Sequence, residues 1–382
     1  DDTAFDQNYP PTTVSDWNVI PTETGGALDE LAKKNASDNI VYVATNGSDV
    51  LGEYEIGNPL KPFLTINAAI SAVPVNGIVK VLGGTYTEEI ALTKEGVDLN
   101  ISGCSIIGRM FINKSNISIT AIGATITNNT INPLFSTSSG AYTNLKIIGG
   151  VWDALNEECI VLSANLTGAI IRDATFISNI VGNVVQVGSD NAKFKDCFIE
   201  GTNAGNVFSF RLTSNTTGVE IENSTIISNG GTGVAMDNDT GLKIRNCKST
   251  GNNYGLFTTT IAGASFDLIA EDCTFLSTAI YGVNLNQVCD NVRFTRCTIV
   301  TQNANQEAVN IGTNRTAAKD TLFEYCTFFA GVNRQVFAQN ENVADTSVTY
   351  VNNCNFNKLA FVYTAQIIET GTVYQPNTPL IL

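Results

Sequence analysis

The stretch IRNCKS at residues 244–249 returns along the chain as AEDCTF at 270–275, FTRCTI at 294–299, FEYCTF at 323–328 and VNNCNF at 351–356. With the small residue at the fourth position of each copy as a mark, related copies can be aligned from residue 84 onward at spacings of 20 to 29 residues. Such a drifting period is typical of a solenoid whose turns differ in loop length. The twelve marks are Gly84, Cys104, Ala124, Gly150, Ala174, Cys197, Ser224, Cys247, Cys273, Cys297, Cys326 and Cys354.

The positions around the mark are apolar at fixed offsets. The residue three before the mark is apolar in all twelve copies, and the residue two after it in eleven, Ser249 being the exception. Because successive side chains of a strand point to opposite faces, both positions are expected to face a shared interior. A further apolar strand recurs about ten residues after the mark, as at 183–187, 254–258 and 281–285. We therefore predict three short strands in each repeat.

The residue just before the mark predicts how the strands are joined. It is Gly, Asn or Asp in ten of twelve copies, and the exceptions are Arg296 and Tyr325. These three residue types tolerate left-handed backbone, so a single such residue would bend every coil. The pattern predicts an all-β protein, a right-handed parallel β-helix of about twelve coils with a short N-terminal capping helix. A pair of β-sandwiches is the alternative, but it would not need the same bend in every repeat.

The cysteines follow the same repeat. Six of the nine occupy the mark between Cys197 and Cys354, and Cys104 makes a seventh, whereas Cys159 and Cys289 lie off it. A buried free cysteine behaves as a small apolar residue, which suits this position. A disulfide framework is the alternative, but side chains stacked in parallel do not present the roughly 90° torsion of a disulfide. We expect reduced, buried thiols.

Composition excludes several classes of function. The chain has 382 residues, no His and a net charge of −15. Without His, catalytic triads and zinc sites that depend on imidazole are excluded. The acidic charge disfavours nucleic acid as a partner, and no apolar run approaches the roughly 18 residues of a membrane span, so we expect no membrane insertion.

The first coil carries a more specific motif. Asn46-Gly47-Ser48-Asp49 is followed by Pro62-Phe63-Leu64-Thr65-Ile66-Asn67-Ala68-Ala69-Ile70 and then by Gly84-Thr85-Tyr86. This order resembles the opening coil of pectin-lyase-like β-helix proteins, over about residues 39–357. Thr65 is expected to cap a short helix whose Ile66, Ala69 and Ile70 cover the open end of the core. The resemblance implies a fold and not a chemistry.

The two ends differ from the repeats. Residues 1–38 are predicted to form an N-terminal arm and connector helix, residues 39–357 the β-helix with its cap, and residues 358–382 a C-terminal cap. The connector, which includes GALDELAKK at 26–34, resembles the one found in tailed-phage tail fibre and tailspike proteins. That resemblance implies a homotrimer. An ordinary surface helix is the alternative interpretation of the same residues.

Enzymes with this fold suggest one possible metal site. The polygalacturonase pattern requires His and cannot be completed. Pectate lyases hold Ca²⁺ on acidic residues beside an Arg base, and Asp237 and Asp239 are the candidate ligands, with Arg211 or Arg245 as the base. Turn chemistry explains these acids equally well. Beyond this calcium alternative, we predict no cofactor.

A carboxylate pair is the remaining catalytic option. Phage endoglycosidases of this fold use two acids, which a glycosidase needs about 5 to 9 Å apart. Asp153, Glu157 and Glu158, in GVWDALNEECI, are the candidates, and the alternative is a solvated surface. The sequence therefore leaves open whether the protein is an enzyme; if it is, we expect a carboxylate-based polysaccharide hydrolase.

The combined interpretation is a phage virion protein of the tail fibre or tailspike type. It is expected to bind a host cell-surface polysaccharide or receptor and other virion tail proteins, in the tail of the virion and outside the cell. The alternatives are a secreted polysaccharide lyase or glycoside hydrolase, and a bacterial adhesin or filament subunit. An enzyme should show a carboxylate cluster on one face of neighbouring coils, whereas an adhesin should show outward rows of polar and aromatic residues without such a cluster.

Overall fold

The computed structural model describes residues 39–128, 132–137, 140–155, 157–205, 207–213, 215–237, 241–258, 266–285, 289–311, 321–339, 349–357 and 367–374. The predicted arm and connector at 1–38, and most of the predicted C-terminal cap at 358–382, lie outside these residues. Asp239 also lies outside them. In the described part, no helix is both long and apolar enough to cross a membrane.

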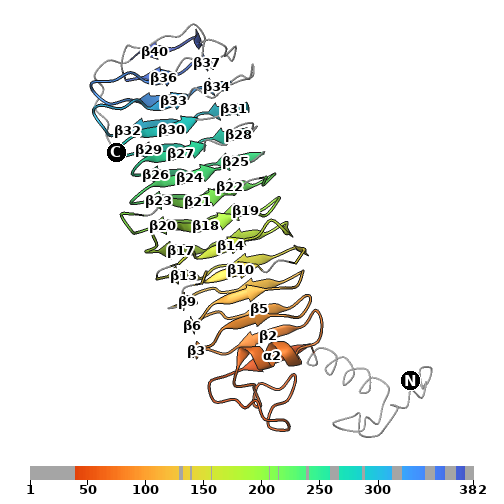
Figure 1. Cartoon of the computed structure of the whole chain (residues 1–382). Helices are drawn as coiled ribbons and strands as arrows, with labels where there is room; N and C mark the ends of the chain where they lie inside the picture. Colours follow the sequence, from red (N-terminus) through yellow and green to blue (C-terminus); the bar gives the residue numbers. More distant parts are fainter. Residues whose placement is uncertain are drawn as a thin grey trace, which may run out of the picture.

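Short parallel strands stack into an elongated right-handed β-helix with three long sheets, which we name A, B and C (Figure 1). Sheet A contains β1 (Ile40–Val43), β2 (Ile78–Val81), β5 (Asp98–Asn100), β8 (Ser118–Thr120), β12 (Lys146–Ile148), β16 (Ile170–Arg172), β19 (Lys193–Lys195), β22 (Glu220–Glu222), β25 (Leu242–Arg245), β28 (Phe266–Glu271), β31 (Cys289–Thr295), β34 (Thr321–Glu324), β37 (Thr349–Asn352) and β39 (Ile367–Thr370).

Sheet B contains β3 (Thr85–Thr87), β6 (Ser105–Ile107), β9 (Thr125–Asn128), β13 (Val151–Ala154), β17 (Thr175–Ser178), β20 (Phe198–Gly201), β23 (Thr225–Ser228), β26 (Lys248–Gly251), β29 (Thr274–Ser277), β32 (Thr298–Thr301), β35 (Thr327–Phe329), β38 (Asn355–Phe356) and β40 (Val373–Tyr374). Sheet C contains β4 (Ile90–Leu92), β7 (Met110–Ile112), β10 (Phe135–Thr137), β14 (Ile160–Leu162), β18 (Asn183–Val187), β21 (Phe208–Leu212), β24 (Thr232–Met236), β27 (Tyr254–Thr258), β30 (Tyr281–Leu285), β33 (Val309–Ile311) and β36 (Phe337–Gln339). A small pair is formed by β11 (Tyr142–Thr143) and β15 (Leu166–Thr167).

Each coil runs from sheet A through a tight turn into sheet B, and then through sheet C back to A. The predicted fold class is confirmed, but the expected number of about twelve coils differs from the structure. Among the described residues, sheet B has 13 strands. The additional strand, β40, follows Gly371, which has a φ of 66°. The pattern missed this coil because Glu369, rather than an apolar residue, stands three positions before its mark.

The turn between sheets A and B is left-handed, as predicted. Eleven of the twelve residues before the mark have a φ between 49° and 74°, and the exception is Gly83. Arg296 and Tyr325 adopt this conformation, at 53° and 55°, although neither residue type favours it. The coils stacked above and below therefore impose the turn even where the local sequence opposes it.

A second set of residues with positive φ, which the sequence analysis missed, lies at the entry to sheet A. Each member stands two positions before a sheet A residue that is paired in register with its counterpart on the next coil. Side chains of this set are in contact between coils, since the Asn144 amide donates to Oδ1 of Asn116 at 2.8 Å. The set consists of Asn76, Gly96, Asn116, Asn144, Gly168, Asn191, Gly218, Gly241 and Asn291. Two bends per coil are thus fixed by residues that tolerate positive φ.

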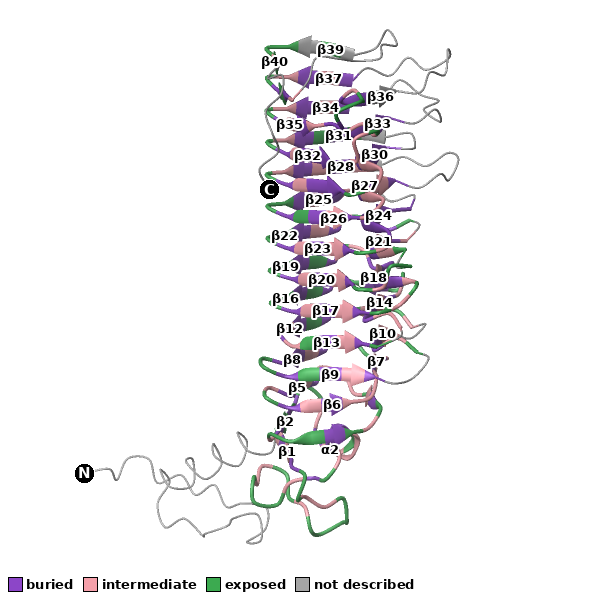
Figure 2. Ribbon diagram, turned by 90° about the vertical axis from the view of Figure 1, so that its left-hand side faces the viewer, coloured by how far each residue is buried: buried purple, intermediate pink, exposed green. Residues whose placement is uncertain are grey.

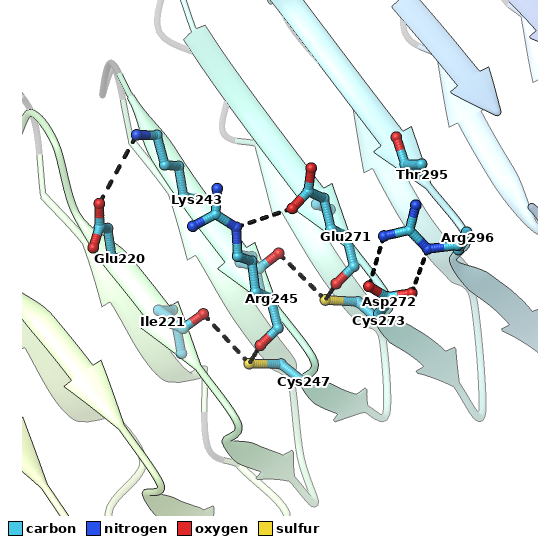
Figure 3. Close-up of polar contacts among 12 residues, drawn as sticks. Glu220, Ile221, Lys243, Arg245, Cys247, Glu271, Asp272, Cys273, Thr295 and Arg296 are labelled. Atoms are coloured by element: carbon cyan, nitrogen blue, oxygen red, sulfur yellow. Dashed lines mark hydrogen bonds and ion pairs between the residues drawn. The ribbon is translucent and has the colours of Figure 1, made fainter.

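The interior is filled by the side chains at the mark, three positions before it and two positions after it, as predicted. Trp152 and the Phe side chains of the inward positions are buried, and so are all seven cysteines of the mark. Cys247 and Cys273 donate to the carbonyls of Ile221 and Ile244, on the preceding coil, at 3.6 and 3.5 Å (Figure 3). Burial raises the pKa of Cys197 to about 12. The thiols therefore act as small apolar groups with a weak donor, as expected.

The N-terminal end is covered by helix α2 (Ile66–Ala72), as predicted. Thr65 is the N-cap, its hydroxyl accepts from the amide of Ala68 at 3.2 Å, and Ile66, Ala69 and Ile70 are buried. The Glu88 carboxylate also accepts from the first helical amide at 2.8 Å. Charge and hydrogen bonding together satisfy the free amides of this helix end. The loop that precedes α2 is largely exposed (Figure 2).

Candidate binding face on sheet C

Three aromatic side chains line up on the outer face of sheet C. Tyr254 of β27 pairs in register with Tyr281 of β30, and their rings stack with centroids 6.1 Å apart. Phe257, on the same strand as Tyr254, stacks on that ring at 4.8 Å with an interplanar angle of 12°. All three are half-buried. We call Tyr254, Phe257 and Tyr281 the aromatic row.

The corner between sheets B and C explains why Tyr254 and Phe257 share a face. The two residues between them are both buried, which departs from simple alternation. A Cβ at Gly255 would lie 2.7 Å from the amide nitrogen of Leu276, so only glycine fits the corner. This tight passage turns the strand and brings both rings outward.

Two asparagine side chains continue the outer face on the neighbouring coils. Asn284 pairs in register with Phe257, and the buried Asn310 amide donates to Oδ1 of Asn284 at 2.9 Å. Burial raises the pKa of both tyrosines above the usual value, and for Tyr281 the nearby charge of Glu307 adds to the effect. The hydroxyls are therefore protonated at neutral pH.

Ion pairs border the aromatic row on both sides. Arg334 lies 3.7 Å from Glu307, whose side chain is 13% exposed. On the other side, Nε of Arg211 donates to Oδ2 of Asp237 at 2.7 Å, and the guanidinium lies 5.3 Å from the ring centre of Phe208. The face therefore combines exposed aromatic surface with charges that are already paired.

Asp237, the described member of the two predicted calcium ligands, is engaged in an ion pair. Asp237 is 5% exposed at its side chain and is held by Arg211, which the lyase interpretation needs as a free base. Arg245, the other candidate base, lies on sheet A and pairs with Glu271 at 2.9 Å. Among the residues that the structure describes, no group of three or more acidic or cysteine side chains could hold a metal ion.

The predicted carboxylate candidates lie away from the aromatic row. Asp153 is on the outer face of β13, and Glu157 and Glu158 follow in the turn toward β14. Burial, and then the nearby charge of Glu158, raises the pKa of Glu157 above its usual value. Burial is also the main cause that raises the pKa of the neighbouring Cys159 to about 12. The structure thus brings Glu157 and Glu158 together.

The outer face of sheet A is different in chemistry. Lys193 pairs with Glu220 at 3.0 Å. Figure 3 shows that Lys243 also pairs with Glu220, at 3.9 Å, and that Arg245 pairs with Glu271 on the next coil. These side chains are 35 to 54% exposed. The sign of these charges alternates from coil to coil, so each of the five is close to an opposite charge.

The sequence analysis missed the aromatic row as a site. It recognised YGLFT at 254–258 and YGVNL at 281–285 only as strands. The shared Tyr-Gly at the start of both segments was the available signal, because glycine at the corner turns the preceding aromatic ring outward.

Comparisons with known proteins bear on the fold. No protein-family model matches the chain, and no curated protein matches it. Among solved structures, the mannuronan C-5 epimerase AlgE6 A-module of Azotobacter vinelandii is 14% identical, with a TM-score of 0.60 over 82% of this chain and 95% of that one.

Two further structures are similar to a lesser degree. The pectate lyase Pel9A is 13% identical, with a TM-score of 0.44 over 87% of this chain and 78% of that one. ORF18 of Geobacillus virus E2 is 12% identical, with a TM-score of 0.44 over 88% of this chain and 65% of that one. From the epimerase module and the strand order, the chain has the right-handed parallel β-helix fold that is typical of pectin-lyase-like proteins.

Proposed function

We propose that the protein is a glycan-binding component of the tail fibre or tailspike type, which attaches a virion to a host-surface polysaccharide. The observation that carries this proposal is the aromatic row on sheet C. Aromatic rings offer apolar faces for the C–H surfaces of sugar rings, and tyrosine hydroxyls add polar contacts at their edges. The row is supported by Asn284 and Asn310, so its shape exists before a ligand binds.

The virion assignment is supported by the resemblance of residues 26–34 to the connectors of tailed-phage fibres. Trimerisation through residues 1–35 belongs to the same proposal. Light scattering on the full chain and on a chain that starts at Asp38 tests it. We expect a trimer mass for the first and a smaller mass for the second, and an identical monomer mass for both would refute it.

Paired charges favour binding over catalysis at this face. Asp237 is engaged by Arg211 and Glu307 by Arg334, so neither carboxylate is placed as a free acid or base. A glycoside hydrolase that uses Glu157 and Glu158 is the second candidate, favoured by the raised pKa of Glu157. However, glycosidase mechanisms need two carboxylates about 5 to 9 Å apart on either side of the scissile bond, and Glu157 and Glu158 are consecutive residues in one turn.

The aromatic row can be tested by binding measurements on a panel of host-surface polysaccharides. Tyr281→Ala should weaken binding of the recognised glycan about tenfold, because one stacked ring contributes about 1.4 kcal/mol. Tyr350→Ala, on sheet A, is the matched control and should leave affinity unchanged. Equal losses in both variants, or none in Tyr281→Ala, would contradict the assignment of the site. Release of reducing ends from the bound glycan would instead support the hydrolase.

A further inference from the structure

A hollow of about 320 Å³ opens on the outer face of sheet A, over the strands β25, β28 and β31. Its volume lies at the lower end of the roughly 300 to 1,000 Å³ of small-molecule sites, which suits a single sugar residue better than a long chain. We call it the sheet A hollow, and its lining includes Gly241, Lys243, Asp267, Ile269, Asn291 and Arg293.

The local backbone explains why the surface is hollowed here. Gly241 and Asn291 belong to the set of positive-φ residues at the entry to sheet A. Where that set contains neighbouring asparagines, their side chains fill the space between coils, but Gly241 has no side chain to do so. In addition, β31 places one extra residue opposite the segment 266–268 of β28, so the strand bulges. Bulges are common beside functional sites because they redirect neighbouring side chains.

The two cationic side chains of the hollow have little opposite charge beside them. Arg293 is exposed and lies in register between Ile269 and Leu322, which are both apolar. Among the residues that the structure describes, its guanidinium has no hydrogen-bond or ion-pair partner. Lys243, on the other side of Ile269, lies 3.9 Å from Glu220, near the upper limit of an ion pair (Figure 3). The hollow can therefore attract an anionic group although the net charge of the chain is −15.

The number of cations favours a phosphate group as this anion. Lys243 and Arg293 are two strand steps apart, about 10 Å between their backbones, and both side chains are long enough to lean toward a group held above Ile269. A phosphate monoester carries nearly two negative charges and three acceptor oxygens, so it can engage both cations. A carboxylate carries one charge and two oxygens, which the fork of one arginine already satisfies.

The other polar groups of the hollow suit sugar hydroxyls. The Asn291 amide donates to Oδ1 of Asp267 at 3.1 Å, which orients the carboxylate. A carboxylate accepts several hydrogen bonds, so Asp267 can also accept from hydroxyl groups of a ligand. Ile269 is half-buried and offers an apolar surface for the C–H groups of a sugar ring.

We propose that the sheet A hollow binds a phosphorylated sugar. Arg293 and Lys243 hold the phosphate, Asp267 accepts from the hydroxyls, and Ile269 contacts the ring. The aromatic row lies on sheet C, so this site does not rest on the function proposed for that row. The measurement on Tyr281→Ala tests the row separately, and either proposal can fail without the other.

Isothermal titration calorimetry with glucose 6-phosphate at low ionic strength tests the site. We expect a Kd in about the millimolar range, at least about tenfold tighter than for glucose. Arg293→Gln should weaken binding of glucose 6-phosphate at least about tenfold, because a charge-assisted contact is lost. Arg172→Gln removes the same charge from the outer face of sheet A, outside the hollow, and should leave the affinity unchanged. Equal affinity for glucose, no loss in Arg293→Gln, or an equal loss in Arg172→Gln would overturn the proposal.

Two further probes separate the phosphate from the sugar. Glucuronate, which carries a carboxylate instead, should bind at least about threefold more weakly than glucose 6-phosphate, and equal binding would overturn the choice of phosphate. Inorganic phosphate should also bind more weakly, and equal binding would overturn the choice of a sugar. Asp267→Asn should narrow the preference for glucose 6-phosphate over inorganic phosphate, because a hydroxyl acceptor is lost and a repelling charge is removed; an unchanged preference would contradict the role of Asp267. Far-UV circular dichroism confirms that each variant is folded.

Discussion

The outer faces of sheets A and C are built from the same coils but have opposite surface chemistry. On sheet A, Lys193, Glu220 and Lys243 alternate in sign along the stack and are well exposed. On sheet C, the aromatic row is half-buried beside the Asn284–Asn310 bond, and the two flanking carboxylates, Asp237 and Glu307, are only 5% and 13% exposed. A regular solenoid can thus carry charged side chains on one face and aromatic side chains on another, because the outward positions do not contribute to the shared core.

The two faces should differ most in the free energy of unfolding that is lost when one cationic side chain is removed from each. Arg211→Ala leaves the buried Asp237 carboxylate without its ion-pair partner and should cost about 3 kcal/mol. Arg245→Ala removes an exposed partner of Glu271 and should cost less than about 1 kcal/mol. Denaturant-induced unfolding measures both. Similar midpoint shifts would mean that the two faces are solvated alike.

A smaller effect is expected from the amides under the aromatic row. Asn310→Ala removes the donor to Asn284 and should cost about 1 to 2 kcal/mol, because the buried Oδ1 loses its partner. Asn352→Ala, at an outward position of sheet A, is the control and should stay within about 0.5 kcal/mol of wild type. Thermal unfolding of both variants makes the comparison. A larger loss at Asn352 than at Asn310 would reverse the ranking of the faces.

Charge reversal on sheet A should have a weaker effect that depends on salt. Lys243→Glu places a carboxylate beside Glu220 and should cost about 0.5 kcal/mol at low ionic strength. In about 0.5 M NaCl the difference should shrink, since salt screens exposed charges. Urea unfolding at two salt concentrations measures it, with Lys243→Gln as the neutral control. A cost that does not change with salt would indicate a desolvated face.

The smallest effect concerns the turn that joins sheets B and C after β13. The folded-state pKa of Glu157 is raised above its unfolded value, so the ionised carboxylate is disfavoured in the fold. The contribution of Glu157 to stability is therefore present at low pH and is lost as pH rises through this pKa. Glu157→Gln should match wild type near pH 3.5 and be more stable by a few tenths of a kcal/mol near pH 7. Scanning calorimetry at the two pH values measures this, and lower stability of the variant at pH 7 would contradict it.

The prediction of the fold from sequence worked because its signals are local and repeated. Thr65 capped the helix as expected, and the inward columns are buried. Arg296 and Tyr325 are not residue types that favour positive φ, yet both adopt the same left-handed turn as the Gly, Asn and Asp residues of the other coils. A repeat enforced by neighbouring coils tolerates single unfavourable residues, since stacked hydrogen bonds on both sides hold the backbone.

The site was predictable only in part, because its contacts are distant along the chain. Asp237 was identified as a candidate, but its partner Arg211 lies 26 residues earlier, and the ion pair between them needs the register of β21 and β24. The aromatic row likewise depends on the pairing of β27 with β30. Nothing local in the sequence indicates which outward side chains meet when loop lengths vary between coils.

The sequence by itself determined the repeat, the interior columns and the left-handed bend before each mark, since these follow from side-chain size, alternation and backbone preference within a few residues. Tertiary structure decided which outward residues become neighbours. The register between coils stacked Tyr254 on Tyr281, placed Arg211 on Asp237 and set Lys243 beside Glu220. The physical reason is that an outward side chain finds its partner about 4.8 Å away across a strand, but more than twenty residues away along the chain.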